Sequence, residues 1–171
     1  MMVGASEIYV LAGVLTSGRD KPTLRELAAE LHVNPTFVHR MLRRAEQAGL
    51  YDGVEKRVNQ PNFEELIAHS ARYIAPARLG ALTPGVPAGW ASAPISKRIG
   101  QADDEPPPVW PDASARTRGQ ALKPLHPSAQ AACRENRKLA ELLAIIDSIR
   151  AGDLRVRGVA TDELHRTLAA P

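Results

Sequence analysis

Apolar residues recur with a helical period in three stretches near the start of the chain. Between Ser6 and Ser17 they stand at spacing i, i+3, i+4, i+7, and a glycine follows. The spacing returns twice between Thr23 and Leu50, in TLRELAAELHVNPTFVHRMLRRAEQAGL. The apolar residues of the three stretches are Ile8, Leu11, Ala12 and Leu15; Leu24, Leu27, Ala28 and Leu31; and Val38, Met41, Leu42 and Ala45. Because this spacing places side chains on one face of a helix, the pattern predicts three helices that close a common core.

The second and third of these helices have clear start and stop signals. Thr23 and Glu26 form an S/T-x-x-E capping box at the start of the second helix. Asn34, followed by a proline, is a suitable N-cap for the third, and Gly49 stands where a left-handed residue is expected to end it. The turn between them covers only residues 32–34. Two helices this close bury both apolar faces by crossing, which is the helix-turn-helix arrangement.

The hydrophobic period changes after the third helix. Asp52-Gly53 separates two short extended runs that end at Val58, and an Asp-Gly pair in this setting is a strong signal for a hairpin. A hairpin directly after the second helix of a helix-turn-helix is the wing of a winged helix. Lys56 and Arg57 stand on it, and we expect them to contact DNA phosphates; solvated loop charges are the alternative.

Basic and polar residues share the other face of the third helix. Thr36, His39, Arg40 and Arg43 stand at i, i+3, i+4, i+7, with Arg44 beside them. The helix has no acidic residue from its N-cap to Ala45. Arginine can donate two hydrogen bonds to guanine in the major groove, or pair with phosphate. A solvated face on an ordinary helix pair would look similar, but the agreement of turn, caps and apolar spacing favours DNA binding.

Residues 6 to about 60 resemble the winged-helix transcriptional regulators of the multiple-antibiotic-resistance-regulator (MarR) type. The segment LRELAAELHVNPTFVHRMLRRAEQAGL and the hairpin after it carry the resemblance. The resemblance implies a DNA-contacting role for Asn34, Thr36, His39, Arg40, Arg43 and Arg44. At His32 the family usually has a left-handed glycine, and histidine is enriched among the other residues that adopt this conformation. The chain departs from the family after the hairpin, where the family's dimer helices flank the DNA-binding core, so no effector pocket is carried over.

The middle of the chain differs in composition from the part before it. A helix is predicted from Phe63 to about Tyr73, with a start like a capping box at Asn62. Ten prolines then fall in the 52 residues from Pro76 to Pro127, and no period persists. We expect an extended or disordered linker, or a segment that wraps over a partner. Its large apolar residues, Leu82, Trp90, Ile95 and Trp110, indicate that part of it packs.

The C-terminal region is predicted to be helical again. A long helix from Ser128 to Arg150 carries a dense aliphatic stripe, and Gly152 stops it. A last short helix would be capped by Thr161 or Asp162. The stripe consists of Leu139, Leu142, Leu143, Ile146 and Ile149. Its spacing approximates a coiled-coil seam, so we expect a homodimer built on this helix; the alternative is that the helix folds back onto its own chain.

Composition narrows the classes of function. The 171 residues carry a net charge of +3 and 44% are hydrophobic, which fits a packed core and a nucleic-acid partner. Cys133 is the only cysteine, which excludes an intramolecular disulfide or a cysteine metal cluster. His126 precedes it by seven residues, but no acid or amide completes a catalytic set. We expect no catalytic residue, no metal site and no cofactor. The sequence has neither an apolar run of the roughly 18 residues a membrane span needs nor the basic start of a signal peptide, so we expect a cytoplasmic protein without a membrane partner.

These observations predict a mainly α fold, with a winged helix-turn-helix of three core helices and a short β-hairpin. The expected domains are a DNA-binding domain at 1–74, a Pro-rich extended or wrapping segment at 75–127, and a helical dimerisation region at 128–171. The expected function is sequence-specific binding of double-stranded DNA to regulate transcription in a bacterium, not catalysis. The alternative is an antitoxin or defence-module protein whose C-terminal half binds a partner protein, a toxin or other defence component, and whose winged helix gives autoregulation.

Overall fold

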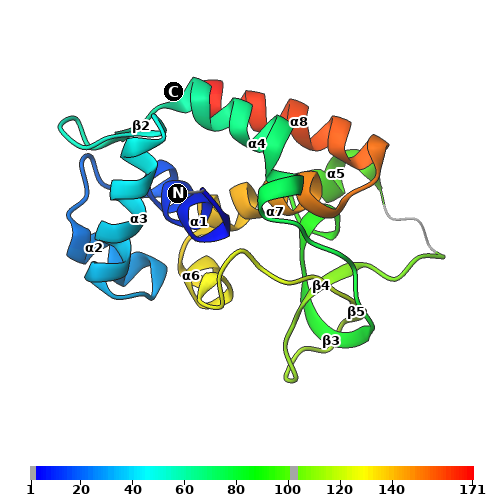
Figure 1. Cartoon of the computed structure of the whole chain (residues 1–171). Helices are drawn as coiled ribbons and strands as arrows, with labels where there is room; N and C mark the ends of the chain where they lie inside the picture. The colour runs from blue at the N-terminus through cyan, green and yellow to red at the C-terminus, as the bar shows by residue number, and fades with distance from the viewer. Residues whose placement is uncertain (1–2, 101–103) are drawn as a thin grey trace. The chain divides into compact units, whose positions relative to one another are not determined.

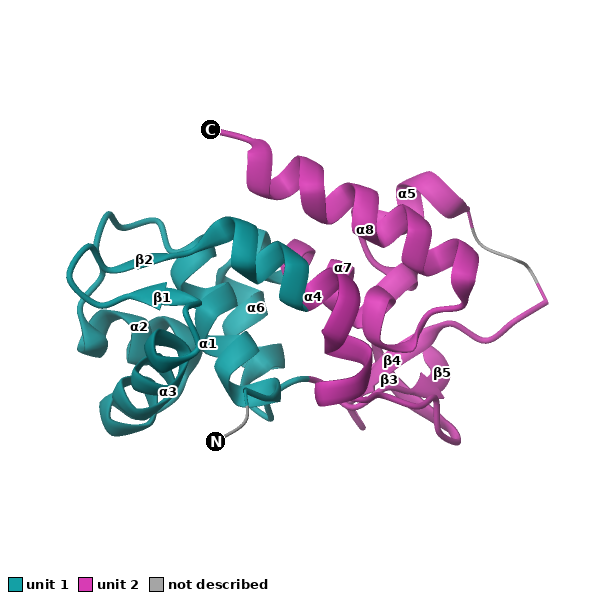
Figure 2. Ribbon diagram, turned by 45° about the horizontal axis from the view of Figure 1, so that its top comes forward, with its two compact units in different colours: residues 1–66, 125–140 teal, residues 67–124, 141–171 magenta. Residues whose placement is uncertain are grey.

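The computed structural model describes residues 3–100 and 104–171 and is mainly helical, as the sequence predicts (Figure 1). The chain divides into two compact units (Figure 2). The first consists of residues 1–66 and 125–140, and the second of residues 67–124 and 141–171. This division differs from the domains expected from the sequence, because residues 125–140 return to the N-terminal helices.

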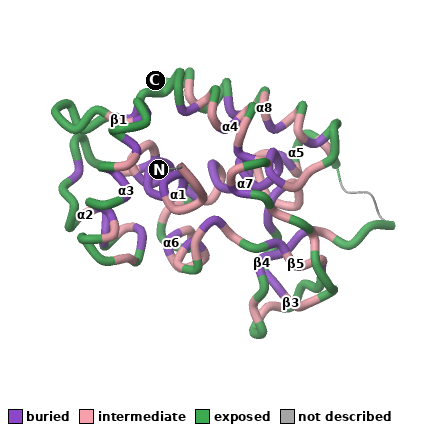
Figure 3. Tube along the Cα trace, viewed as in Figure 1, coloured by how far each residue is buried: buried purple, intermediate pink, exposed green. Residues whose placement is uncertain are grey.

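Three helices form the core of the first unit, at the positions the apolar spacing predicts. They are α1 (Ala5–Thr16), α2 (Leu24–Leu31) and α3 (Pro35–Gln47). The predicted apolar residues are buried or half-buried, except Leu24, which is 37% exposed. Figure 3 shows buried segments alternating with exposed ones along these helices. Gly13 of α1 allows a close helix crossing, since a Cβ there would lie 2.7 Å from the Leu31 side chain of α2.

The predicted helix ends are confirmed at atomic detail. The Thr23 hydroxyl accepts a hydrogen bond from the Glu26 N–H (3.2 Å), and the Glu26 carboxylate accepts one from the Thr23 N–H (2.8 Å). His32 is left-handed, with φ 54° and ψ 44°, at the turn position where a left-handed residue was expected. The Asn34 carboxamide oxygen accepts from the backbone N–H three residues on (2.7 Å), and Gly49 has φ 74°. These local signals fix the turn between α2 and α3 and the end of α3.

The hairpin forms, but its turn differs from the expected two-residue Asp-Gly turn. Strands β1 (Tyr51–Asp52) and β2 (Arg57–Val58) pair antiparallel, and four residues, 53–56, connect them. The Asp52 carboxylate accepts hydrogen bonds from the N–H groups of Val54 (2.9 Å) and Glu55 (3.0 Å). Asp52 closes the turn with its side chain, so the left-handed residue is Lys56 (φ 53°) rather than the glycine.

Helix α4 (Gln60–Ile74) starts three residues before the predicted Phe63. The predicted cap at Asn62 is wrong: Asn59 caps the helix, accepting from the Asn62 N–H at 3.1 Å. The Asn62 side chain instead donates to the Gly49 carbonyl (2.9 Å) and so attaches α4 to the end of α3. A proline at position 61 fits the first turn, where a helix needs no N–H donor.

The prediction of an extended linker at 76–127 is wrong for the described residues. This segment folds into β3 (Leu82–Pro87), the 3-10 helix η1 (Gly89–Ala91), α5 (Ile95–Ile99), β4 (Pro108–Pro111) and β5 (Arg118–Ala121). Strand β3 pairs antiparallel with β4 and with β5, and β4 pairs parallel with β5, so the three strands close on one another. These three strands are four to six residues long, and prolines in them hide the period-2 alternation that would predict a strand from the sequence.

Two helices replace the single long helix predicted from Ser128 to Arg150. They are α6 (Ala129–Glu135) and α7 (Arg137–Ala151). Asn136 lies between them in an extended conformation, with φ −136° and ψ 99°. Its side chain accepts from the Leu139 N–H and donates to the Thr16 carbonyl, both at 3.1 Å. Asn136 thus ends one helix, caps the next and attaches both to α1.

The aliphatic stripe of α7 is buried within one chain. Its five members are each 1% exposed or less: Leu139, Leu142, Leu143, Ile146 and Ile149. The surface proposed for the homodimer is therefore already filled, as in the alternative in which the helix folds back. The predicted start of the last helix at Thr161 or Asp162 is also wrong, since α8 (Leu154–Ala169) begins at the Asp153 cap.

Candidate nucleic-acid interface

The exposed face of α3 carries the residues expected to contact DNA. Four of them are exposed on this helix: Thr36, His39, Arg40 and Arg43. Among residues 3–100 and 104–171, no carboxylate forms an ion pair with Arg40 or Arg43. The Arg40 guanidinium carbon lies 6.0 Å from the centroid of the Phe37 ring, at the limit of a cation–π contact. Both arginines therefore keep their hydrogen-bond donors available to an external acceptor.

Two other predicted contact residues have structural partners. Arg44 points toward α1, where its guanidinium lies 3.2 Å from the carboxylate of Glu7. The Glu7 side chain is only 4% exposed, and its second oxygen accepts from the Gly4 N–H (2.9 Å). Asn34 uses its side-chain oxygen to cap α3. The structure thus gives Arg44 a role in joining α3 to α1, and Asn34 a role in starting α3.

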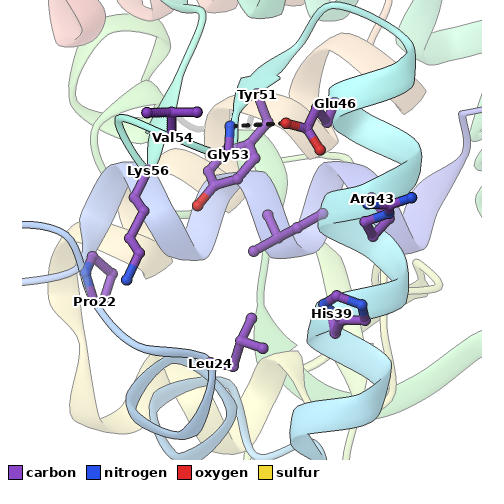
Figure 4. Close-up of a pocket in the computed structure, with 10 residues that line it drawn as sticks. Pro22, Leu24, His39, Arg43, Glu46, Tyr51, Gly53, Val54 and Lys56 are labelled. Carbon is purple, nitrogen blue, oxygen red and sulfur yellow. Dashed lines mark hydrogen bonds between the residues drawn. The ribbon is translucent and has the colours of Figure 1, made fainter.

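A pocket of about 360 Å³ lies between α3, the hairpin and the start of α2 (Figure 4). Its lining residues are Pro22, Leu24, His39, Leu42, Arg43, Glu46, Tyr51, Gly53, Val54 and Lys56. His39 and Arg43 stand on α3 at one side, and Lys56 stands across from them on the hairpin. The Glu46 carboxylate accepts from the Gly53 N–H (3.2 Å) and so ties the end of α3 to the hairpin. The arrangement places cations on both sides of an apolar floor.

The hairpin charges are arranged unequally. Glu55 lies 3.3 Å from the Lys21 ammonium and 3.1 Å from the Arg57 guanidinium. Hydrogen bonds from Lys21 and Arg57 hold the pKa of Glu55 below its usual value. Backbone N–H groups of Glu55 and Val54 likewise lower the pKa of Asp52. Lys56 forms no ion pair within the part of the chain that the structure describes, so it is the hairpin cation most available to a phosphate.

His126 and Cys133 both lie in the first unit. The His126 ring stacks on Tyr9 with centroids 5.0 Å apart, and also contacts Phe37 at 5.1 Å. Its Nδ1 accepts from the Ser128 N–H (3.1 Å), and burial lowers its pKa. These contacts join the chain before α6 to α1 and α3, which is a packing role.

The described residues contain no group of three or more His, Cys, Asp or Glu side chains that could hold a metal ion. In the same residues, the helices are too short or too polar to cross a membrane.

Sequence reasoning missed three parts of this surface. Leu24 was predicted to lie on the core face of its helix, although it lines the pocket, and no role was predicted for Tyr51, which lines the pocket too. The Lys21–Glu55 contact joins residues 34 positions apart, so no local sequence pattern predicts it. The contact between Glu46 and Gly53 could have been predicted, because the two residues are only seven positions apart and lie on either side of the end of α3.

No family model matches the chain, and no curated protein or solved structure matches it either.

Proposed function

We propose that this protein is a winged helix-turn-helix regulator that binds double-stranded DNA sequence-specifically. In this proposal α2 and α3 form the helix-turn-helix, and β1 with β2 forms the wing. The observation that carries the proposal is the exposed face of α3, whose Arg40 and Arg43 have no ion-pair partner in the described ranges. Tight capping at Asn34 and Gly49 supports it further, because a helix that reads bases needs a fixed position.

Four exposed residues of α3 contact DNA in the proposal, together with Lys56 of the wing. Arg40 and Arg43 read base edges, where a bidentate contact with guanine discriminates by about 1–3 kcal/mol. Thr36 and His39 hydrogen-bond to neighbouring bases or phosphates. Lys56, across the pocket from α3, pairs with a phosphate of the backbone that runs between helix and wing. Arg44 stabilises the fold and is not assigned to DNA, because it is paired with Glu7.

A homodimer remains part of the proposal on general grounds. One winged helix reads few base pairs, and two-fold dimers match half-sites about 34 Å apart. The dimer needs a surface other than the stripe of α7, whose five aliphatic residues are buried within the chain. Sedimentation of the protein with and without DNA measures the oligomeric state directly.

The alternative is an antitoxin or defence-module protein whose C-terminal half binds a partner, and an extended Pro-rich segment that wraps the partner was its main support. The described residues of that segment up to Pro124 belong to the second unit, where Trp110 and Ile95 are buried, so this support is lost. DNA binding is therefore the function that we propose.

Selection of bound duplexes from a random pool, followed by fluorescence anisotropy, tests the proposal. We expect an enriched motif, and we expect Arg40→Ala with Arg43→Ala to weaken binding to it by about 1–3 kcal/mol per arginine that reads a base. Arg116→Ala with Arg118→Ala is the matched control, since it removes the same charge from exposed sites of the second unit. Equal binding by the α3 variant and the wild type would refute the assignment of α3.

A further inference from the structure

We propose that Glu55 limits the protein's sequence-independent affinity for DNA by holding Lys21 and Arg57 away from the phosphates. This inference rests on the proposed function. Glu55 is thus a positioning residue: it does not touch DNA, but determines whether Lys21 and Arg57 can contact it.

The geometry around Glu55 is that of a shared acceptor. One carboxylate oxygen, Oε2, accepts from the Lys21 ammonium at 3.3 Å and from the Arg57 guanidinium at 3.1 Å. Lys21 comes from the loop between α1 and α2, and Arg57 from β2, so one side chain gathers cations from two segments. All three side chains are 45–70% exposed, so they lie where a nucleic acid could reach them.

The charge balance of the hairpin differs from that of α3. Residues 51–58 carry two acids, Asp52 and Glu55, against two bases, Lys56 and Arg57, and so have no net formal charge. Residues 35–47 carry three arginines and one glutamate, which leaves two positive charges. Asp52 is committed to the backbone of the turn, where it accepts two hydrogen bonds. Glu55 is therefore the acid whose removal would leave the turn intact and make the wing cationic.

The consequence for binding follows from the nature of phosphate contacts. A cation that meets a phosphate adds affinity for every sequence alike and steepens the salt dependence, by about 0.9 in the slope of log K against log salt for each phosphate. With Glu55 in place, Arg40, Arg43 and Lys56 are the arginine and lysine side chains of α3 and the wing that have no ion-pair partner in the described part of the chain. Without it, Lys21 and Arg57 would add up to two further phosphate contacts.

Glu55→Gln tests this inference, because it keeps the size of the side chain and removes its charge. Binding to a duplex of random sequence is measured by anisotropy across salt concentrations. We expect several-fold tighter binding at low salt and a slope steeper by about 0.9–1.8. Adding Lys21→Gln should reverse about half of the gain. Thermal unfolding should stay near that of the wild type, since exposed ion pairs contribute little to stability.

Glu65→Gln is the matched control. Glu65 is exposed on α4 in the same unit, and its change alters net charge equally without releasing Lys21 or Arg57. The inference is overturned if Glu55→Gln leaves the slope unchanged, or if Glu65→Gln steepens it as much. The proposed function fails separately, if the wild type binds no duplex or if the loss of Arg40 and Arg43 has no effect.

Discussion

Removal of the Asp147 carboxylate should destabilise the second unit more than any surface substitution. Asp147 lies on α7 with no exposed surface, and Arg150, one turn later, is 7% exposed. The carboxylate lies 2.6 Å from the Arg150 guanidinium and accepts from the Trp110 indole N–H at 2.9 Å. Asp147→Ala would leave a buried guanidinium without its counter-charge and an indole N–H without its acceptor.

The magnitude follows from these contacts. Removing one partner of a buried ion pair costs about 3–5 kcal/mol, since the remaining charge stays buried. Arg150 keeps a hydrogen bond to the Ala75 carbonyl (2.7 Å), which reduces the loss, whereas the unpaired indole adds about 1 kcal/mol. We therefore expect Asp147→Ala to lower the free energy of unfolding by about 3–4 kcal/mol.

Urea unfolding followed by tryptophan fluorescence measures this change selectively. Trp90 and Trp110 are the only tryptophans, and both belong to the second unit, so their emission reports its unfolding. The midpoint should fall while the slope of free energy against urea stays constant. Asp162→Ala is the control, because Asp162 pairs with Arg98 at 2.8 Å on an exposed surface and should leave the midpoint nearly unchanged. A midpoint for Asp147→Ala equal to that of the control would refute the reasoning.

Two predictions concern the first unit. Arg44→Ala should lower the free energy of unfolding of the first unit by about 1–3 kcal/mol, because Glu7 would stay buried without its partner. DNA affinity should stay near the wild-type value at temperatures where the fold persists. Calorimetry measures the first effect and anisotropy the second, and a loss of affinity without a loss of stability would show that Arg44 contacts DNA. Burial holds the pKa of His126 below 6.5, so the unfolded chain binds a proton more readily than the folded one. The contribution of neutral His126 to stability should thus be fully present above pH 6.5 and be lost as the pH falls below it. Hydrogen exchange of the α1 amides measures this loss, and His126→Phe should remove it. An equal decline in that variant would contradict the prediction.

The parts of the fold that could be predicted are those set by neighbouring residues. Capping at Thr23 and Asn34, the left-handed His32 and the end at Gly49 each depend on a few adjacent positions, so their patterns are visible in the sequence. The exposed face of α3 follows from the same period that buries its other face. Arg44 could not be assigned from period alone, because its partner Glu7 lies 37 residues earlier.

The errors have a common physical cause, which is pairing between distant segments. The strands β3, β4 and β5 are stabilised by one another, and proline masks their local preference for extended structure. Asn136 stands where the polar face of one long helix would also have a polar residue, and its bonds to the Leu139 N–H and to the distant Thr16 carbonyl distinguish the break. The role of Glu55 likewise could not be predicted from the sequence, because it depends on Lys21, which only the fold brings beside it.

The return of residues 125–140 to the N-terminal helices has a consequence for the order of folding during synthesis. The hydroxyl of Ser128 donates to the His32 carbonyl (2.9 Å), and the Asn136 side chain donates to the Thr16 carbonyl at the end of α1. The N-terminal helices therefore gain these partners only after about one hundred further residues have been synthesised. Until then Tyr9 lacks the stacked ring of His126. A nascent chain that ends before α6 therefore exposes apolar surface that the complete first unit covers, and such surface is what chaperones recognise.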